Sequence, residues 1–150
     1  MAALSAARLI AGGCGLGRAP RAPGTVASFA AVLVGAAALL AAPWALLAAA
    51  AVLATLGGVW AIRAAGATGD PGWVVIDEVA GQWITLLAVP RVTLPWLAAA
   101  FVLFRLLDIT KPGPVGWADR RHGAVWVMAD DVIAGMIGAA LLLGAGAALE

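Results

Sequence analysis

Five apolar segments constrain this chain more strongly than any other feature of its sequence. A helix needs roughly 17–25 apolar residues to cross a bilayer, and the backbone of a spanning segment must satisfy its own hydrogen bonds. The pattern therefore predicts an all-α, polytopic integral membrane bundle of about four to five apolar helices, with the third and fourth being short. The segments cover residues 25–42, 44–62, 73–89, 96–109 and 132–149.

Composition also indicates that lipid is the main solvent of this chain. Hydrophobic residues make up 64% of the 150 residues and charged residues only 11%, whereas a soluble domain is typically about 25% charged. The length predicts one domain over residues 1–150. The single cysteine, Cys14, excludes an intramolecular disulfide. A net charge of +1 provides no excess of cations for binding nucleic acid.

The distribution of charge predicts how the chain lies in the membrane. If the N-terminus is cytoplasmic, eight of the nine basic residues fall on the cytoplasmic side and only Arg91 falls outside, as the positive-inside rule requires. Seven of the eight acids then share that face, with Glu150 as the exception. The charged stretch 104–131 and the earlier acids are therefore expected to meet at the cytoplasmic surface, where short loops form a site.

Acidic residues within apolar segments are the first candidates for chemistry. Asp77, Glu78 and Asp108 fall inside the predicted segments, where a charged group costs about 2.5–3.5 kcal/mol and usually marks function. Without cysteine or histidine partners, these carboxylates suit a hard cation such as Mg²⁺, Mn²⁺ or Ca²⁺. The alternative is that acids simply favour helix N-termini. That explanation fits Asp130 and Asp131 but not Asp108, which lies near a predicted C-terminus.

A short repeat links two acid pairs. The segments 77–81 (DEVAG) and 130–135 (DDVIAG) each begin with two acids, and in each an acid lies one turn before a glycine. Successive helix residues point about 100° apart, so one acid of each pair can face a metal while the other binds a basic residue or a second ion. The sequence does not decide which acid does so. In a chain this rich in Ala, Val and Gly, the repeat could also arise by chance.

Basic residues supply the opposite charge. Lys111, Arg120 and Arg121 follow the fourth apolar segment, and such side chains suit phosphate recognition. A divalent cation beside them is the equipment for phosphoryl chemistry, although cytoplasmic loops are basic in any membrane protein. The glycine-rich run 12–17 (GGCGLG) leads towards the first long apolar segment and could present N–H groups to a phosphate. Thr25 is the expected N-cap of that segment.

Three blocks of sequence resemble one enzyme family. They are residues 15–25 with Ser28, residues 69–83, and the run from 104–112 through 119–121 to 128–135. Together they are similar to phosphatidylglycerophosphatase A, a lipid phosphatase of the bacterial inner membrane. The chain departs from the family pattern where glycine or phenylalanine is usual, at Ala27, Leu107, Ala124 and Trp126.

The resemblance implies Mg²⁺-dependent removal of the terminal phosphate from phosphatidylglycerophosphate, giving phosphatidylglycerol. It implies a multi-pass protein of the bacterial cell inner membrane, whose partners are this lipid and the bilayer. Water activated by the metal is the expected nucleophile, and a covalent aspartyl-phosphate is the alternative. From the residues and the resemblance together we expect metal ligands at Asp70, Asp77, Glu78, Asp130 and Asp131. We expect catalytic roles for Asp77, Glu78, Asp108, Lys111, Asp130 and Asp131. The phosphate is expected to be bound by Thr25, Ser28, Arg105, Lys111, Arg120 and Arg121, and Asp119 belongs to the same polar set.

Other functions stay open at this point. A phosphatase for a different phosphomonoester lipid would use the same residues. A cation transporter would need acids spread through the depth of the bilayer. A membrane scaffold without chemistry would give no reason for Asp108 and Lys111 to lie so close to an apolar span.

Overall fold

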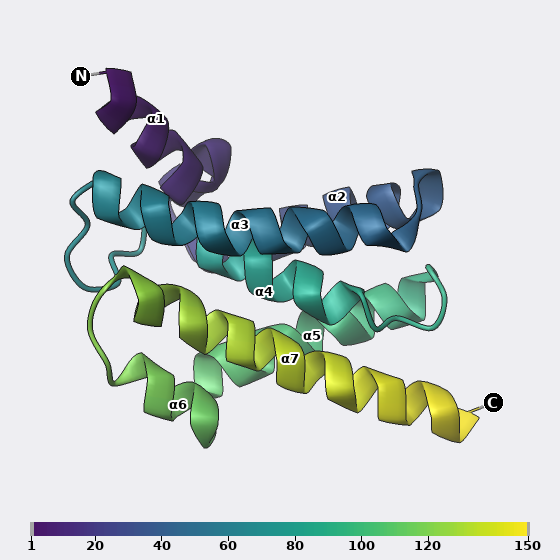
Figure 1. The fold of residues 1–150 in the computed structure, drawn as a ribbon. Coiled ribbons are helices and arrows are strands. Elements are labelled where there is room, and N and C mark those ends of the chain that lie inside the picture. Colours follow the sequence, from purple (N-terminus) through teal and green to yellow (C-terminus); the bar gives the residue numbers. More distant parts are fainter. Residues whose placement is uncertain (1, 150) are drawn as a thin grey trace.

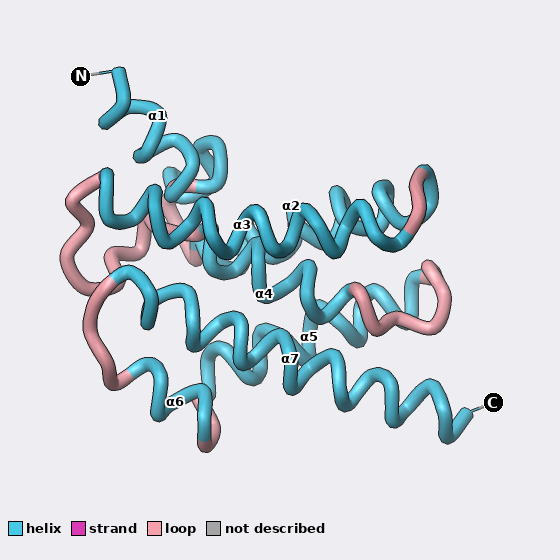
Figure 2. The backbone as a smooth tube through the Cα atoms, in the orientation of Figure 1, coloured by secondary structure: helices cyan, strands magenta, loops and turns pink. Residues whose placement is uncertain are grey.

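The computed structural model describes residues 2–149, with side chains from residue 5 onward, and in this range every regular element is a helix. The all-α prediction is confirmed. Figures 1 and 2 show helices of very different length joined by short loops. The elements are α1 (Ala2–Ala11), the 3-10 helix η1 (Gly13–Arg18), α2 (Pro23–Ala41), α3 (Trp44–Ala64), α4 (Ile76–Leu86), α5 (Leu94–Thr110), α6 (Pro114–Asp119) and α7 (Ala124–Leu149).

Three of the five predicted apolar segments form helices that are long and apolar enough to cross a membrane. These are α2, α3 and α7. The third segment is much shorter than its hydropathy predicts, because α4 has only 11 residues. Its predicted first residues instead form a turn, in which the Val75 N–H donates to the Ala11 carbonyl at 2.9 Å. The fourth segment forms α5, which has 17 residues.

Two predicted helix starts are wrong. Helix α2 begins at Pro23, after Ala22 in a left-handed conformation (φ 46°), so Thr25 lies inside the first turn and is not the N-cap. Helix α7 begins at Ala124, directly after Gly123 with φ 104°. Asp130 and Asp131 therefore lie inside α7 and not at its N-terminus. These two charges end the apolar segment of the sequence, but the helix extends beyond them toward the N-terminus.

The short helix α4 is the element around which the others pack. It contacts α2, α3, α5 and α7, and in Figure 1 it lies between α3 and α7. Most of its residues are buried, including the polar side chains of Asp77, Gln82 and Thr85. Because protein surrounds α4, its polar groups are shielded from the hydrocarbon that would penalise them.

Helices α4 and α7 approach closely at Gly81 and Gly135. A Cβ atom on Gly81 would lie 2.5 Å from the Asp131 carbonyl oxygen, and one on Gly135 would lie 2.5 Å from the Gly81 carbonyl oxygen. Small residues permit such contact between apolar helices. The repeated acid–glycine spacing of the sequence thus coincides with this crossing: Asp77 and Asp131 each lie four residues before the glycine of their own helix.

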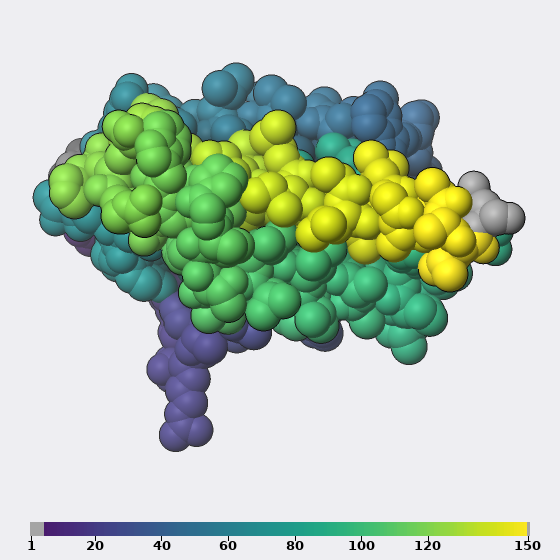
Figure 3. Space-filling view, turned by 90° about the horizontal axis from the view of Figure 1, so that it is seen from below, coloured from purple at the N-terminus to yellow at the C-terminus, as the bar shows by residue number. Residues whose placement is uncertain are grey.

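The charged residues gather at one end of the bundle. The C-terminal ends of α3 and α5 and the N-terminal ends of α4 and α7 lie at the same end, while the loops at 42–43 and 87–93 lie at the other (Figures 1 and 2). In the space-filling view, α7 (yellow-green to yellow) runs along one face and the N-terminal part of the chain (purple) projects from the body (Figure 3).

Candidate active site

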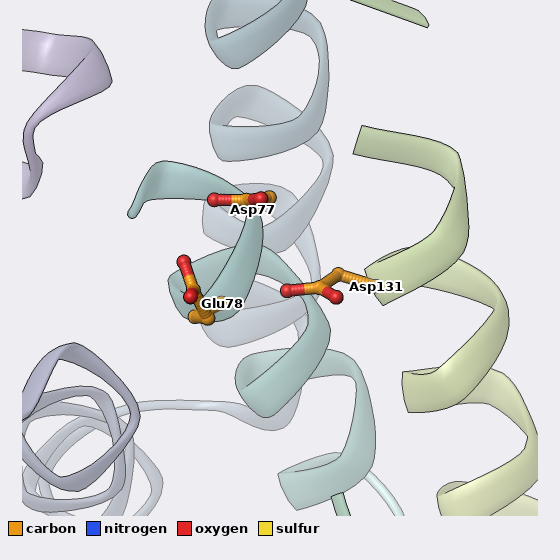
Figure 4. A group of neighbouring side chains, drawn as sticks. All are labelled: Asp77, Glu78 and Asp131. Carbon is orange, nitrogen blue, oxygen red and sulfur yellow. The ribbon is translucent and has the colours of Figure 1, made fainter. Parts of the chain in front are cut away.

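Three carboxylates meet between α4 and α7. Asp77 and Glu78 lie in the first turn of α4, and Asp131 reaches across from α7 (Figure 4). Each offers an oxygen, and these three atoms lie within 4.8 Å of one another. Asp77 is 4% exposed and Asp131 2% exposed, so water can solvate them very little. We call these three residues the acid cluster.

The acid cluster fits a divalent cation. Among residues 5–149, one buried oxygen of each member has no hydrogen-bond partner: Asp77 Oδ1, Glu78 Oε2 and Asp131 Oδ2. Buried carboxylates are costly unless paired or bound to a cation. Three oxygen donors without nitrogen or sulfur suit Mg²⁺ or another hard ion. The geometry therefore supports a metal site at these three of the five predicted ligands.

A second group of charges surrounds Lys111. Its Nζ lies 2.5 Å from Asp130 Oδ2, 3.2 Å from Asp119 Oδ1 and 3.4 Å from Asp108 Oδ1. Burial lowers the pKa of Lys111, but the hydrogen bond to Asp130 and the charges of nearby acids outweigh it, so the pKa lies above its ordinary value. The neighbouring carboxylates therefore favour the charged form of the ammonium. We call Lys111 with these three aspartates the lysine cluster.

The backbone of Lys111 explains how its side chain reaches this position. Lys111 caps the end of α5 in a left-handed conformation with φ 50° and ψ 50°. Such a residue reverses the direction of the chain after a helix. The short helix α6 then brings Asp119 back to the ammonium, and α7 brings Asp130.

Arg105 joins the two clusters. It forms an ion pair with Asp108, and its Nη1 lies 3.9 Å from Glu78 Oε1. Its Nη2 donates to Thr25 Oγ1 at 3.3 Å. The start of α2 also packs tightly here, since a Cβ atom on Gly24 would collide with the Glu78 carboxylate. One guanidinium thus contacts side chains from α2, α4 and α5.

Asp70 lies on the side of the lysine cluster. A cavity of about 80 Å³ is lined by Asp70, Asp119, Arg121, His122 and Asp130, among others. Burial raises the pKa of Asp70, the charge of Lys111 lowers it, and the neighbouring acids Asp108 and Asp119 raise it further, for a net increase. Asp70 is not a member of the acid cluster, although the sequence grouped it with the metal ligands.

Other predicted residues occupy different surroundings. Asp130 Oδ2 contacts Lys111 and its Oδ1 accepts a hydrogen bond from the Asp131 backbone N–H, but its carboxylate is not one of the three in the acid cluster. Ser28 is fully buried, and its hydroxyl donates to the Gly24 carbonyl within α2. Arg120 is exposed. The guanidinium of Arg121 lies 4.1 Å from the Trp117 ring centroid and 4.8 Å from that of Trp126.

Gln82 was not among the predicted site residues. This residue is fully buried one turn after Glu78, and its Nε2 donates to the Ala100 carbonyl at 3.3 Å. Its Oε1 has no hydrogen-bond partner among residues 5–149. A glutamine four residues after an acid in an apolar segment is a signal that could have revealed it, because residues at that spacing share a helix face.

Comparison with known proteins identifies the family. The phosphatidylglycerophosphatase A family model matches residues 9–146. The chain is 40% identical over 138 residues to phosphatidylglycerophosphatase A of Escherichia coli (strain K12), covering 89% of this chain and 80% of the relative. It is 42% identical over 136 residues to a Bacteroides thetaiotaomicron protein named "Putative phosphatidylinositol-3-phosphatase", covering 85% of this chain and 86% of the relative.

A shorter match, 42% over 66 residues, links the chain to phosphatidylglycerophosphatase A of Haemophilus influenzae and covers 43% of this chain and 40% of that protein. No solved structure matches the chain. The family match and the Escherichia coli relative each span most of the sequence, and the chain therefore belongs to the phosphatidylglycerophosphatase A family.

Proposed function

We propose that this protein is a Mg²⁺-dependent lipid phosphatase that hydrolyses the terminal phosphomonoester of phosphatidylglycerophosphate to phosphatidylglycerol and phosphate. The observation that carries the proposal is the acid cluster, whose three buried oxygens lack partners and lie near the ammonium of Lys111. The family match over residues 9–146 supports this substrate and one phosphatase domain.

The acid cluster would hold the metal through Asp77, Glu78 and Asp131. When bound, Mg²⁺ would supply positive charge that stabilises the phosphoryl group and favours deprotonation of a nearby water. Asp77 and Asp131 lie on two helices that touch at glycines, so the distance between them is fixed before any ion arrives. Such preorganisation is what a precise metal site requires.

Lys111 and Arg105 would bind the phosphate of the substrate. Both are held by carboxylates, Lys111 by Asp130 and Arg105 by Asp108, so their positions are set in advance. Lys111 would act through its positive charge, which the surrounding carboxylates stabilise. In the reaction the oxygen of water would bond to phosphorus and the bond from phosphorus to the glycerol oxygen would break. The glycerol oxygen would take up the proton that the attacking water loses.

The arrangement of charge supports a site at the cytoplasmic surface of the bacterial inner membrane. The loops and helix ends that carry the acids and Lys111 share one end of the bundle (Figure 2), and positive charge there favours the cytoplasm. The lipid tails of the substrate would stay beside the apolar helices α2, α3 and α7. A cation transporter is less well supported, because the described acids do not continue to the opposite end.

The test is phosphate release from phosphatidylglycerophosphate by purified protein, with Mg²⁺ and with chelator. We expect release that needs Mg²⁺ and falls to background in Asp131→Asn. Arg91→Gln, a change in the loop at the far end of the bundle, is the matched control and should retain activity. Absence of release, or equal release in chelator, would contradict the proposal.

A second substrate is favoured by one comparison. The name of the Bacteroides relative refers to a phosphatidylinositol-3-phosphatase, and the residues described above recognise a phosphomonoester and not a particular alcohol. Measuring kcat/KM for phosphatidylglycerophosphate, phosphatidylinositol 3-phosphate and phosphatidic acid under the same conditions decides between them. A preference for either of the last two would assign a different lipid to the same site.

A further inference from the structure

A cavity of about 400 Å³ lies apart from both charge clusters, beside the N-terminal segment. Arg8, Leu9, Gly12, Gly17, Arg18 and Trp73 are among the residues that line it. None of its lining residues belongs to the acid cluster or the lysine cluster. The proposed phosphatase reaction gives this cavity no role.

Backbone contacts hold the cavity in shape. The glycine-rich run after α1 folds back on itself, with Gly17 N–H donating to the Gly12 carbonyl at 3.0 Å. Cys14 and Gly15 adopt positive φ values of 57° and 104° in this turn. Gly17 packs so closely on the Trp73 carbonyl that any Cβ atom would collide with it. The turn is thus fixed against the segment that leads into α4.

Among the described residues, the charged side chains that line the cavity are both basic. Arg8 lies 6.0 Å from the centroid of the Trp73 ring, and Arg18 lines the same space. Within residues 5–149, neither arginine pairs with a carboxylate, whereas Lys111 and Arg105 do. Two guanidinium groups without acidic partners around one cavity favour an anion, and arginine is well suited to phosphate oxygens.

The surroundings of the cavity suit a membrane surface. Next to Arg8, the side chains of Leu9 and Ile10 are 52% and 38% exposed. A short helix with exposed apolar residues beside a basic one is typical of interfacial helices, and tryptophan is common at the same depth. Anionic lipids attract such basic groups at the cytoplasmic leaflet.

We propose that this cavity binds the phosphodiester headgroup of an anionic phospholipid, at a site separate from the acid cluster. Arg8 and Arg18 contact the phosphate, and Trp73 forms the wall over which Arg8 lies. This site does not depend on the proposed catalytic activity. It would anchor α1 and η1 to the anionic leaflet and so hold the segment that precedes α4.

The experiment measures the thermal unfolding of the full chain in neutral detergent with chelator present, so that no metal contributes. Dioleoylphosphatidylglycerol is compared with dioleoylphosphatidylcholine and with inorganic phosphate. We expect phosphatidylglycerol to raise Tm by about 3 °C or more, because a ligand that binds only the folded state stabilises it. Phosphatidylcholine and inorganic phosphate should give no comparable rise.

Variants distinguish binding in this cavity from nonspecific electrostatic attraction between the protein and anionic lipid. The double variant Arg8→Gln/Arg18→Gln should lose the rise in Tm, and Arg8→Lys/Arg18→Lys should keep part of it. Arg63→Gln is the matched control, since Arg63 is an exposed arginine at the end of α3 that lines a different cavity. An unchanged rise in the glutamine double variant, or an equal loss in Arg63→Gln, would overturn the proposal. A rise of the same size with inorganic phosphate would overturn its assignment to a lipid.

Discussion

The carboxylates of two neighbouring acids of α7 have different partners. Asp131 faces Asp77 and Glu78, and one of its oxygens has no hydrogen-bond partner among residues 5–149. Asp130 lies 2.5 Å from the ammonium of Lys111. Neighbouring helix residues point about 100° apart, which is enough to place one carboxylate in the acid cluster and the other in the lysine cluster.

The acid cluster and the lysine cluster differ in how their charges are paired. In the lysine cluster every acid contacts a cation, because Lys111 contacts all three aspartates. Among residues 5–149, the acid cluster forms a single ion pair, in which Arg105 Nη1 lies 3.9 Å from Glu78 Oε1. The first is a preformed group that can position a phosphate. The second is incomplete without a cation, and this contrast predicts different consequences for closely matched variants.

The largest expected effect comes from removing one charge of the acid cluster. Asp131→Asn keeps the size of the side chain but removes a metal ligand, so we expect kcat/KM for phosphate release to fall at least about 100-fold. The Mg²⁺ concentration for half-maximal activity should rise as well. Titration of activity with Mg²⁺ measures both quantities.

Asp130→Asn is the matched control for Asp131→Asn, because it changes the adjacent residue in the same way. It should weaken activity without changing the Mg²⁺ concentration for half-maximal activity, since the Asp130 carboxylate pairs with Lys111 and is not one of the three in the acid cluster. If Asp130→Asn raised the Mg²⁺ requirement more than Asp131→Asn, the division into two clusters would be wrong.

The next effect concerns the lysine cluster. In Lys111→Gln, Asp119 and Asp130 lose their cation and Asp108 keeps only Arg105. We expect kcat/KM to fall about 10- to 100-fold, because a charged hydrogen bond to phosphate contributes about 1.5–3 kcal/mol. The Mg²⁺ requirement should stay unchanged. Lys111→Arg restores charge and should recover part of the loss. Equal kcat/KM for the wild type and Lys111→Gln would exclude Lys111 from phosphate binding.

How well the sequence predicts each helix depends on whether its residues face lipid or are covered by protein. Hydropathy predicts α2, α3 and α7 as helices because lipid-facing segments of that length have few alternatives. It misplaces the start of α7, because Asp130 and Asp131 are polar yet buried within the protein. It also overestimates α4, which is covered by neighbouring helices and need not span a bilayer.

The candidate site, too, could be predicted from the sequence only in part. The charged residues and their gathering at one end follow from sequence, because loop charge and topology are linked. The assignment of Asp130 to Lys111 and of Asp131 to Asp77 does not, because it depends on the rotation of α7 against α4. That rotation is set by contacts such as Gly135 on Gly81.

A smaller effect should follow from separating those two helices. Gly81→Ala places a Cβ atom 2.5 Å from the Asp131 carbonyl, and overpacking of this kind costs about 1–3 kcal/mol. We expect Tm to fall and the Mg²⁺ requirement to rise, because Asp77 and Asp131 move apart. Gly57→Ala, where a Cβ atom meets nothing within 4 Å, is the control and should leave both unchanged or raise Tm.

The smallest effect tests whether Arg121 binds phosphate. Its guanidinium lies against Trp117 and Trp126, whose rings meet edge to face at 5.3 Å. If stacking is its role, Arg121→Lys should lower stability by about 0.5–1 kcal/mol and change kcat/KM less than about threefold. Trp126→Leu, which removes one ring and leaves the charge, should behave similarly. A loss above about tenfold in Arg121→Lys, with Trp126→Leu near wild type, would instead place Arg121 in direct contact with the phosphate.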